Sequence, residues 1–227
     1  VALLKRTDTK FVIHIKFIPL ILEELKYNYE VLEIKKKRIM EYSSLYLDTP
    51  EFKFYFDHHN GRVNRTKIRQ RKYVDSNLTF LEIKQKNGKG ETNKSRIKID
   101  DFETNLSKSS SEFIQKVTNN NFKLVPSLWN SFNRMTLVNL KDKERVTIDL
   151  KLSYSINNEE KKYNNLAIIE VKQSRFNRNA IVVKTLKKFK YNPYSISKYC
   201  IGVVNIYNDL KYNLFKKKIL KINKISA

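Results

Sequence analysis

Short stretches in which apolar and polar residues alternate make up most of the chain. Each is rich in β-branched or aromatic residues and is bounded by turn residues, which is typical of strands with one buried face. The pattern is found at residues 9–15, 43–48, 64–74, 78–86, 93–99, 131–140, 144–153 and 166–173. We therefore predict about eight strands that follow one another in near-meander order.

Helical spacing occurs in fewer places. Apolar residues at intervals of three and four predict helices over 19–40 and 110–120, and residues from Ser109 to Ser111 are expected to cap the second. Two further helices are expected over 179–190 and within 195–210. The basic tail over 216–227 is expected to be a frayed or solvated end.

The composition is strongly basic and still suits a folded core. Lys and Arg total 46 against 23 Asp and Glu, giving a net charge of +23, which calls for an anionic partner or a strongly solvated surface. A hydrophobic fraction of 41% excludes a wholly disordered polycation. The lone Cys200 excludes an internal disulfide and favours a reducing compartment such as the cytoplasm. We expect one domain over 1–227 and no membrane span, because the most apolar early run, 11–22, is short and interrupted.

The polar faces of the strands carry the candidate chemistry. Side chains alternate between the two faces of a strand, so Arg65, Lys67, Arg69 and Arg71 project to one side while Ile68 projects to the other. Later strands repeat the pattern, with charged faces made of Glu82, Lys84 and Lys86; of Lys94, Arg96 and Lys98; of Arg145, Thr147, Asp149 and Lys151; and of Glu170 and Lys172.

Two arrangements would account for these charged faces. An open antiparallel sheet would turn them toward water, which is the usual arrangement. Alternatively, the sheet curls into a barrel whose charged face points inward and whose apolar outer face is covered by helices. Like charges on neighbouring strands repel, and a merely solvated face tends to mix signs. The excess of cations therefore favours a tunnel that binds a polyanion.

Arginine at the centre of the pattern favours phosphate as the ligand, because the planar guanidinium makes bidentate contacts with phosphate oxygens. A phosphate-handling enzyme also needs a hard divalent cation such as Mg²⁺ or Mn²⁺, which prefers carboxylate oxygens. The carboxylates on the charged faces are Asp8, Glu82, Asp149 and Glu170. For any single one of them, a salt bridge within the cationic cluster is the better interpretation.

Three weaker candidates have ordinary structural explanations. His58 and His59 could bind a metal, but an adjacent pair just before a glycine is more typical of a solvated turn. Cys200 is better interpreted as a small core residue than as a nucleophile. Tyr73 or Phe80 could contact a nucleotide base, although core packing is the usual role of such aromatic residues.

The order of motifs resembles the VTC domain, the polyphosphate polymerase domain of the vacuolar transporter chaperone complex, which belongs to the CYTH-like triphosphate tunnel metalloenzymes. The resemblance extends from about residue 6 to residue 202. It rests on RTDTKFVIH at 6–14, SLYLDTPEFKFY at 44–55, KIRQRKY at 67–73, FLEIKQK at 80–86, NKSRIKI at 93–99, FNRMTL at 132–137, ERVTIDLKL at 144–152, IIEVK at 168–172 and SISKYCIG at 195–202.

The resemblance implies an α+β fold: an eight-stranded antiparallel β-barrel tunnel with a polar, basic lumen, flanked by helices. It implies that phosphate is contacted by Lys10, Arg69, Arg71, Lys84, Arg134, Arg145 and Lys198. Further phosphate-binding positions are expected among Lys67, Lys94, Arg96 and Lys98, and Glu170 matches the family's metal-binding glutamate, for Mn²⁺ or Mg²⁺. The wider superfamily begins with two glutamates and a lysine at alternate positions, where this chain has Arg6, Asp8 and Lys10. The loss of the first acid weakens a hydrolase interpretation.

The leading hypothesis is a metal-dependent polymerase that transfers the γ-phosphoryl of ATP to a growing polyphosphate chain. Its partners would be ATP and polyphosphate, with pyrophosphate or phosphate as a primer, and no nucleic acid. A triphosphatase that hydrolyses tripolyphosphate or a nucleoside triphosphate in the same fold is the second hypothesis. The third is a basic module without enzymatic activity that binds RNA, DNA or polyphosphate through its surface charge.

Overall fold

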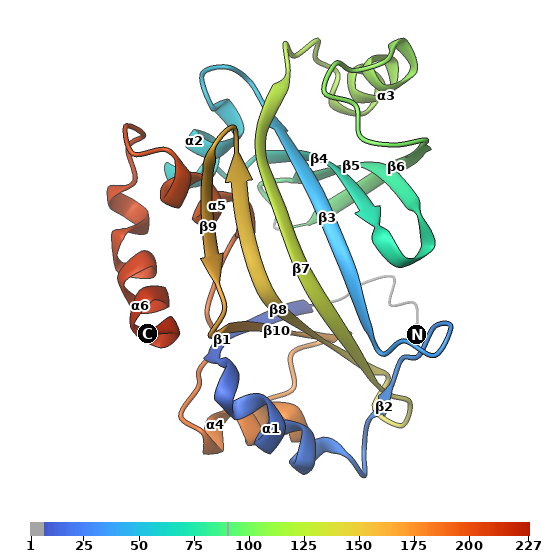
Figure 1. Ribbon diagram of the computed structural model, residues 1–227, viewed down its shortest axis with the longest axis vertical. Coiled ribbons are helices and arrows are strands. Elements are labelled where there is room, and N and C mark those ends of the chain that lie inside the picture. Colours follow the sequence, from blue (N-terminus) through green and yellow to red (C-terminus); the bar gives the residue numbers. More distant parts are fainter. Residues whose placement is uncertain (1–6, 90) are drawn as a thin grey trace.

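A strongly curved antiparallel sheet forms the body of the protein in the computed structural model, which describes residues 7–89 and 91–227 (Figure 1). Its main path runs in the order β1-β10-β8-β7-β3-β4-β5-β6, while β2 pairs with β7 and β9 pairs with β8. The strands are β1 (Thr7–His14), β2 (Glu30–Val31), β3 (Ile39–Asp48), β4 (Arg65–Tyr73), β5 (Leu78–Lys86), β6 (Thr92–Ile99), β7 (Val125–Asn139), β8 (Glu144–Ile156), β9 (Glu159–Tyr163) and β10 (Leu166–Gln173).

The eight predicted strands are confirmed, and they form the main path of the sheet. The predicted order is wrong in part, because β3 pairs with β7 and β1 pairs with β10, across long stretches of sequence. The sheet is curled without closing, since β1 and β6 end the path and do not pair within the described ranges. The free edge of β1 is partly covered by another segment, in which the Tyr194 amide donates to the Lys10 carbonyl over 2.7 Å.

Six α-helices are described beside the sheet, with three short 3₁₀ turns. They are α1 (Ile18–Leu25), α2 (Lys53–His59), α3 (Lys108–Thr118), α4 (Ile181–Lys188), α5 (Lys198–Ile206) and α6 (Lys216–Ser226), and the turns span Ile15–Phe17, Val74–Ser76 and Asn213–Phe215. The helices expected over 110–120, 179–190 and within 195–210 are therefore confirmed. The predicted cap of α3 is wrong by two residues, because the side chain of Ser107 accepts from the Ser110 amide.

The helix expected over 19–40 ends much earlier than predicted. It stops at Leu25, and Glu30 and Val31 then pair with β7. Tyr29 decides this change of direction, because its buried ring joins the core while its hydroxyl donates to the buried carboxylate of Glu144 on β8. A tertiary anchor of this kind overrides helical spacing.

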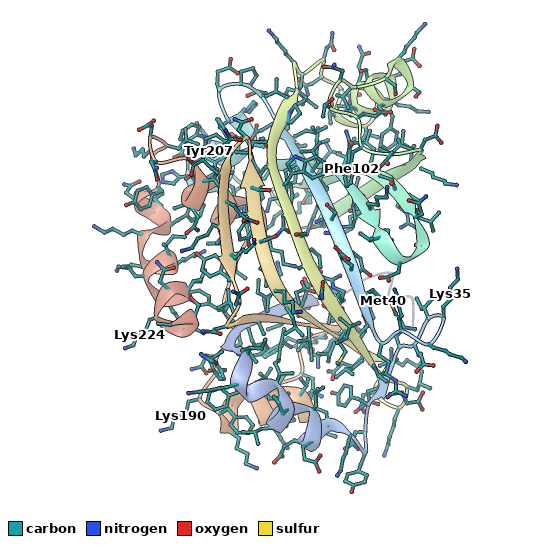
Figure 2. All side chains as sticks on the ribbon, in the orientation of Figure 1. Lys35, Met40, Phe102, Lys190, Tyr207 and Lys224 are labelled. Atoms are coloured by element: carbon teal, nitrogen blue, oxygen red, sulfur yellow. The ribbon has the colours of Figure 1, made fainter. Side chains whose placement is uncertain are left out.

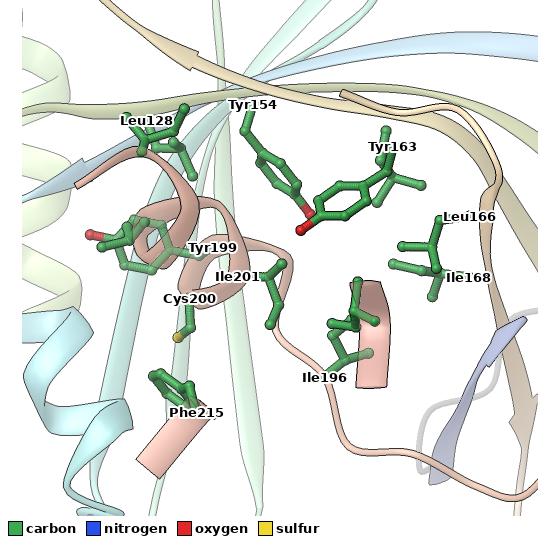
Figure 3. Packing of buried hydrophobic residues seen from close by; sticks show 14 of the residues in the cluster. Leu128, Tyr154, Tyr163, Leu166, Ile168, Ile196, Tyr199, Cys200, Ile201 and Phe215 are labelled. Carbon is green, nitrogen blue, oxygen red and sulfur yellow. The ribbon is translucent and has the colours of Figure 1, made fainter. Parts of the chain in front are cut away.

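Alternation along the strands divides the apolar side chains among three clusters. On the outer face, β1, β8 and β10 pack against α1 and α4, while β3 to β6 pack against α3. The third cluster lies at one end of the concave face, where α5 and α6 cover it (Figure 1). Figure 3 shows Tyr199, Cys200 and Ile201 of α5 in this third cluster, with Tyr154, Tyr163 and Phe215 around them. Helices thus cover the apolar outer face, as predicted for an inward-facing charged surface.

The C-terminal tail is folded, which corrects the expectation of a frayed end. Residues 216–226 form α6, and Ile222 is fully buried against the cluster that includes Val12 and Ile168. The apolar residues Ile219, Ile222 and Ile225 recur at helical spacing, so one face packs while four of the five lysines stay exposed.

Asp48 fixes the position of α5 relative to the sheet. Its buried carboxylate accepts from the backbone amides of Phe54 and Tyr55 in α2 over 2.8 and 3.0 Å, and from the Tyr199 hydroxyl in α5 over 2.5 Å. These bonds tie the end of β3 to both helices. They hold the first turn of α5, which carries Lys198, against the concave face.

Candidate functional site

The concave face of the sheet carries a cluster of charged side chains, as predicted from alternation. On β4, Arg69 lies opposite Glu82 of β5, and Lys67 lies opposite Lys84. The intervening Ile68 is buried in the outer cluster that α3 covers. The charged and apolar faces of this strand are thus those expected from the sequence.

Asp149 on β8 is the centre of the cluster and is only 3% exposed. It accepts a bidentate contact from Arg134 on the neighbouring β7, with Nε to Oδ1 at 2.6 Å and Nη2 to Oδ2 at 2.8 Å, and it also binds Lys198 of α5. Burial favours the neutral acid, but Lys198 and Arg134 outweigh it and hold the pKa of Asp149 well below its usual range. The Lys198 ammonium also stands 3.5 Å from the centre of the Phe132 ring, which makes a cation–π contact.

Glu170 on β10 forms a second charged group with three neighbours on the concave face. It binds Lys172 and lies 3.9 Å from Lys10 of β1, and Lys172 also lies 3.6 Å from Asp8. Burial again favours the neutral acid, but Lys172 and Lys10 lower the pKa of Glu170 to about 2. The carboxylate is therefore ionised at neutral pH.

Lys172 was not among the predicted phosphate ligands, yet its side chain is 7% exposed within this group. The signal that could have found it is its alternate position to Glu170 along one strand, together with its register opposite Arg145. It competes with any other ligand of Glu170.

Arg69 and Arg71 face the same side but have different surroundings. Arg69 donates from Nε and Nη2 to Glu82 Oε2 over 2.8 and 2.6 Å. Arg71 is 8% exposed and has no carboxylate within ion-pair distance among the described residues; its Nε donates to the Ser44 hydroxyl over 3.2 Å. Burial and the neighbouring Arg69 lower the pKa of Arg71 to about 10.

Three predicted phosphate ligands lie toward the end of the concave face that α5 covers. Lys10 donates to the Ile196 carbonyl over 3.2 Å, and Lys67 donates to the Ser197 hydroxyl over 2.7 Å. The segment before α5 thus spans from β1 to β4. Lys84 keeps contact with solvent, but the surrounding curved sheet removes part of its hydration. This partial desolvation and the ammonium groups of Lys94 and Lys10 lower the pKa of Lys84 to about 8.

The remaining predicted positions lie at the margins of the cluster. Arg145 is half-buried on β8, in register with Lys172. The structure does not bring Lys94, Arg96 and Lys98 into the centre, because they lie exposed on the edge strand β6. Arg6 lies outside the described residues.

The weaker candidates are settled by their packing. His58 and His59 belong to α2, with His59 buried, so the expected solvated turn is wrong. Cys200 is 1% exposed, and burial raises the pKa of its thiol, as expected for a core residue. Figure 3 shows its sulfur directed toward Phe215.

The aromatic side chains at the other end of the concave face form a group that contains Tyr73 and Phe80, the two candidates for contact with a base, together with Tyr42, which the sequence did not reveal. Tyr42 and Tyr73 have ring centroids 5.0 Å apart, and Tyr73 meets Phe80 edge to face at 5.9 Å. Cations border the group: the Arg96 guanidinium stands 4.7 Å from the Phe80 ring and that of Arg134 5.2 Å from the Tyr42 ring. Half-buried rings beside cations are suited to stacking on a nucleotide base.

A preformed metal centre is absent from the described part of the chain, where no three His, Cys, Asp or Glu side chains group together. Asp149 and Glu82 are already paired with arginines. Glu170 is ionised and faces the cluster, so it fits a site in which one carboxylate and substrate phosphates share the ion, which is common for Mg²⁺.

Comparison with known proteins gives the family. The sequence profile of the VTC domain matches residues 5–207. The chain belongs to the VTC domain family. No curated protein matches it. No helix in the described ranges has both the length and the apolar character needed to cross a membrane.

Two solved structures have a similar fold at low sequence identity. A "putative adenylate cyclase" from Vibrio parahaemolyticus is 10% identical, with a TM-score of 0.50, and the match covers 96% of this chain and 99% of the other. A second protein with the same description, from Bacillus halodurans, is 12% identical, with a TM-score of 0.53, and the match covers 85% and 94% of the two chains. These similarities support the fold of this VTC domain. Its reaction has to be inferred from the chemistry of the concave face.

Proposed function

We propose that this VTC domain transfers the γ-phosphoryl group of ATP to a growing polyphosphate chain within its curved sheet, with the help of a divalent cation. The observation that carries the proposal is the composition of the concave face. Cations from β1, β4, β5, β7, β8, β10 and α5 gather there, and the carboxylates among them are already paired. The surplus positive charge suits a linear polyanion.

The reaction needs little covalent help from the protein. An oxygen of the terminal phosphate attacks the γ-phosphorus of ATP, a new P–O bond forms, the bond to the bridging oxygen breaks, and ADP leaves. Catalysis of this kind depends on positioning and on charge neutralisation. Arg71 and Arg134 would hold phosphate oxygens through their planar guanidinium groups, while Lys84 and Lys198 would neutralise charge as it moves.

The divalent cation would be held by Glu170 together with phosphate oxygens. When bound, it would neutralise charge on the triphosphate. Lys172 and Lys10 occupy the same carboxylate in the absence of substrate, so we expect metal affinity to depend on bound triphosphate. The aromatic group of Tyr42, Tyr73 and Phe80 would contact the adenine base.

The test is to incubate the pure protein with ATP and Mn²⁺ and to separate the products on a gel stained for polyphosphate. Long chains are expected. Free phosphate without chains would instead support a triphosphatase, and absence of turnover with any triphosphate, together with tight nucleic-acid binding, would support the basic module.

A matched pair of variants locates the activity on the concave face. Arg134→Gln removes a cation of the cluster, whereas Lys187→Gln removes an exposed cation from α4, on the outer side of the sheet. Only the first should abolish chain synthesis. Equal loss in both variants would contradict the location.

A further inference from the structure

The cations of the concave face differ in whether a carboxylate accompanies them. Toward the middle, carboxylate contacts are made by Arg69, Arg134, Lys172 and Lys198. Toward the end covered by α5, no ion pair with a carboxylate forms among the described residues for Arg65, Lys67 or Lys84. A polyanion bound beside these three residues would displace no carboxylate from them, so phosphates there meet positive charge that no carboxylate compensates.

The C-terminal helix adds a cation to this same end. Lys218 of α6 is half-buried, and its ammonium lies 5.9 Å from the centre of the Phe215 ring. Phe215 is buried, and its ring centroid lies 5.9 Å from that of His58 in α2. Lys218, in the first turn of α6, thus lies near a buried ring that contacts α2, unlike a lysine on a mobile tail.

The surroundings of His58 show which cations meet there. Burial, followed by Lys67, Arg65, Lys218 and Lys10, lowers the pKa of His58 to about 2. Contacts bring β4 and α6 to the same place, because Lys67 donates to the Ser197 hydroxyl, which also accepts from the Cys200 amide. The Cys200 sulfur points toward Phe215, the ring that Lys218 approaches. Such a gathering is unfavourable without an anion, because like charges repel in a region with little water.

We propose that Lys218 extends the phosphate-binding face onto α6, next to Arg65 and Lys67, so that the helix binds phosphates of a chain longer than the central cluster can hold. The inference rests on the proposed function in taking linear polyphosphate as the ligand. α6 lies beyond residues 5–207, so this contact is an addition to the part of the chain that matches the family.

The same helix provides a matched control. Lys217 precedes Lys218 and has the same charge, but its side chain is exposed. The outer lysines of α6 point to solvent, as Figure 2 shows for Lys224. A general attraction between a basic helix and a polyanion would treat Lys217 and Lys218 alike, whereas a defined contact would not.

The experiment measures binding of tripolyphosphate and of polyphosphate about sixty units long to wild type, Lys218→Gln and Lys217→Gln at near-physiological salt. Lys218→Gln should weaken long-chain binding about three- to tenfold, the effect expected for one charged contact near the surface. Tripolyphosphate binding by Lys218→Gln, and both affinities of Lys217→Gln, should stay within twofold of wild type.

Three results would overturn the inference: equal losses in the two variants, no loss in Lys218→Gln, or an equal loss of tripolyphosphate binding. Thermal unfolding of Lys218→Gln and of a second variant, Lys218→Arg, separates a binding effect from damage to the packing, because Lys218→Arg keeps the charge and should keep the long-chain affinity. The binding measurement does not depend on turnover, so its result can be interpreted even if the polymerase assay fails.

Discussion

Arg69 and Arg71 offer a direct test of how charge is balanced on the concave face, because they share a strand and a face but differ in their partners. Arg69 is paired with Glu82, whereas the partners of Arg71 among the described residues are the Ser44 hydroxyl and the rings of Tyr42 and Phe132. We predict that Arg71→Gln stabilises the protein in the absence of ligand and that Arg69→Gln destabilises it.

The magnitudes follow from burial and pKa. The pKa of Arg71 falls from an ordinary 12.5 to about 10. At about 1.4 kcal/mol for each unit of pKa, keeping this arginine charged costs roughly 3 kcal/mol. Subtracting roughly 1–2 kcal/mol for lost ring and hydroxyl contacts leaves a net stabilisation of about 1–2 kcal/mol. Arg69→Gln leaves Glu82, whose side chain is 19% exposed, without its partner. We expect the free energy of unfolding of Arg69→Gln to fall by about 2 kcal/mol, which is less than the loss caused by breaking a fully buried ion pair.

Urea unfolding without ligand measures both effects, and a thermal melt should move by about +3 °C for Arg71→Gln and by about −5 °C for Arg69→Gln. Tripolyphosphate affinity should fall about 10- to 100-fold in both variants, because each loses a charge-assisted contact. Equal destabilisation of the two variants would refute the reasoning, since it would mean that Arg71 is as well compensated as Arg69.

Three further predictions concern Lys84, Glu170 and Gly202. The folded-state pKa of Lys84 is about 8, so the unfolded chain binds more protons between about pH 8 and 10, and stability without ligand should rise with pH across that window. Triphosphate binding at about pH 9 should therefore take up protons, which calorimetry in two buffers measures, and the absence of uptake would contradict the assignment. Glu170→Gln should weaken Mn²⁺ binding in the presence of a non-hydrolysable ATP analogue and barely alter triphosphate binding without metal; unchanged metal affinity would sink the metal site. Gly202→Ala places a Cβ 2.4 Å from a side-chain atom of Leu128 and 2.5 Å from one of Tyr154, so urea unfolding should show a loss of about 2–3 kcal/mol. Wild-type stability would mean that α5 shifts freely.

Each of these variants needs a control variant or a control measurement. Lys84→Met should abolish the proton uptake. Glu170→Gln also leaves Lys172 without its main partner, so its stability must be measured beside its metal affinity. Gly88→Ala serves as the control for Gly202, because a Cβ there would lie 3.8 Å from the Val63 side chain and 4.0 Å from that of Asn64, which are ordinary contact distances.

The alternation of residues made the sheet and its charged face predictable. Strands such as Arg65–Tyr73 carry the signal within a few residues, so the shared face of Arg69 and Arg71 followed from period two alone, and the excess of cations favoured placing that face inward. The VTC motifs added Lys198 and Glu170, which alternation could not distinguish from salt-bridge residues. How strongly each cation is compensated was beyond prediction, because the partners are distant in sequence, as Asp149 and Lys198 are.

Short or highly charged elements were missed for physical reasons. The strand β9 has the sequence EEKKY, which shows no apolar alternation. Backbone pairing with β8 holds it, so its side chains give no sign of a strand. Residues 26–31 leave the helical path because Tyr29 finds Glu144 across the sheet. The folding of the tail was not predicted, because lysines outnumber its three isoleucines, although the spacing of the isoleucines is helical.

The central claim is that triphosphate binds within the curved sheet, and the most direct measurement is displacement of a labelled, non-hydrolysable ATP analogue by two competitors. Polyphosphate is a narrow chain that can enter the concave face, whereas a DNA duplex is too wide to fit inside a sheet of about eight strands that is curled this strongly. Because α6 contributes Ile222 to the core, the basic tail should be neutralised by substitutions at its exposed lysines Lys216, Lys217, Lys221 and Lys224 and kept in place. We predict that polyphosphate displaces the analogue at near-physiological salt and that double-stranded DNA, at equal phosphate concentration, does so only weakly. Equal displacement by both would show that the cations form an open surface and would contradict the claim.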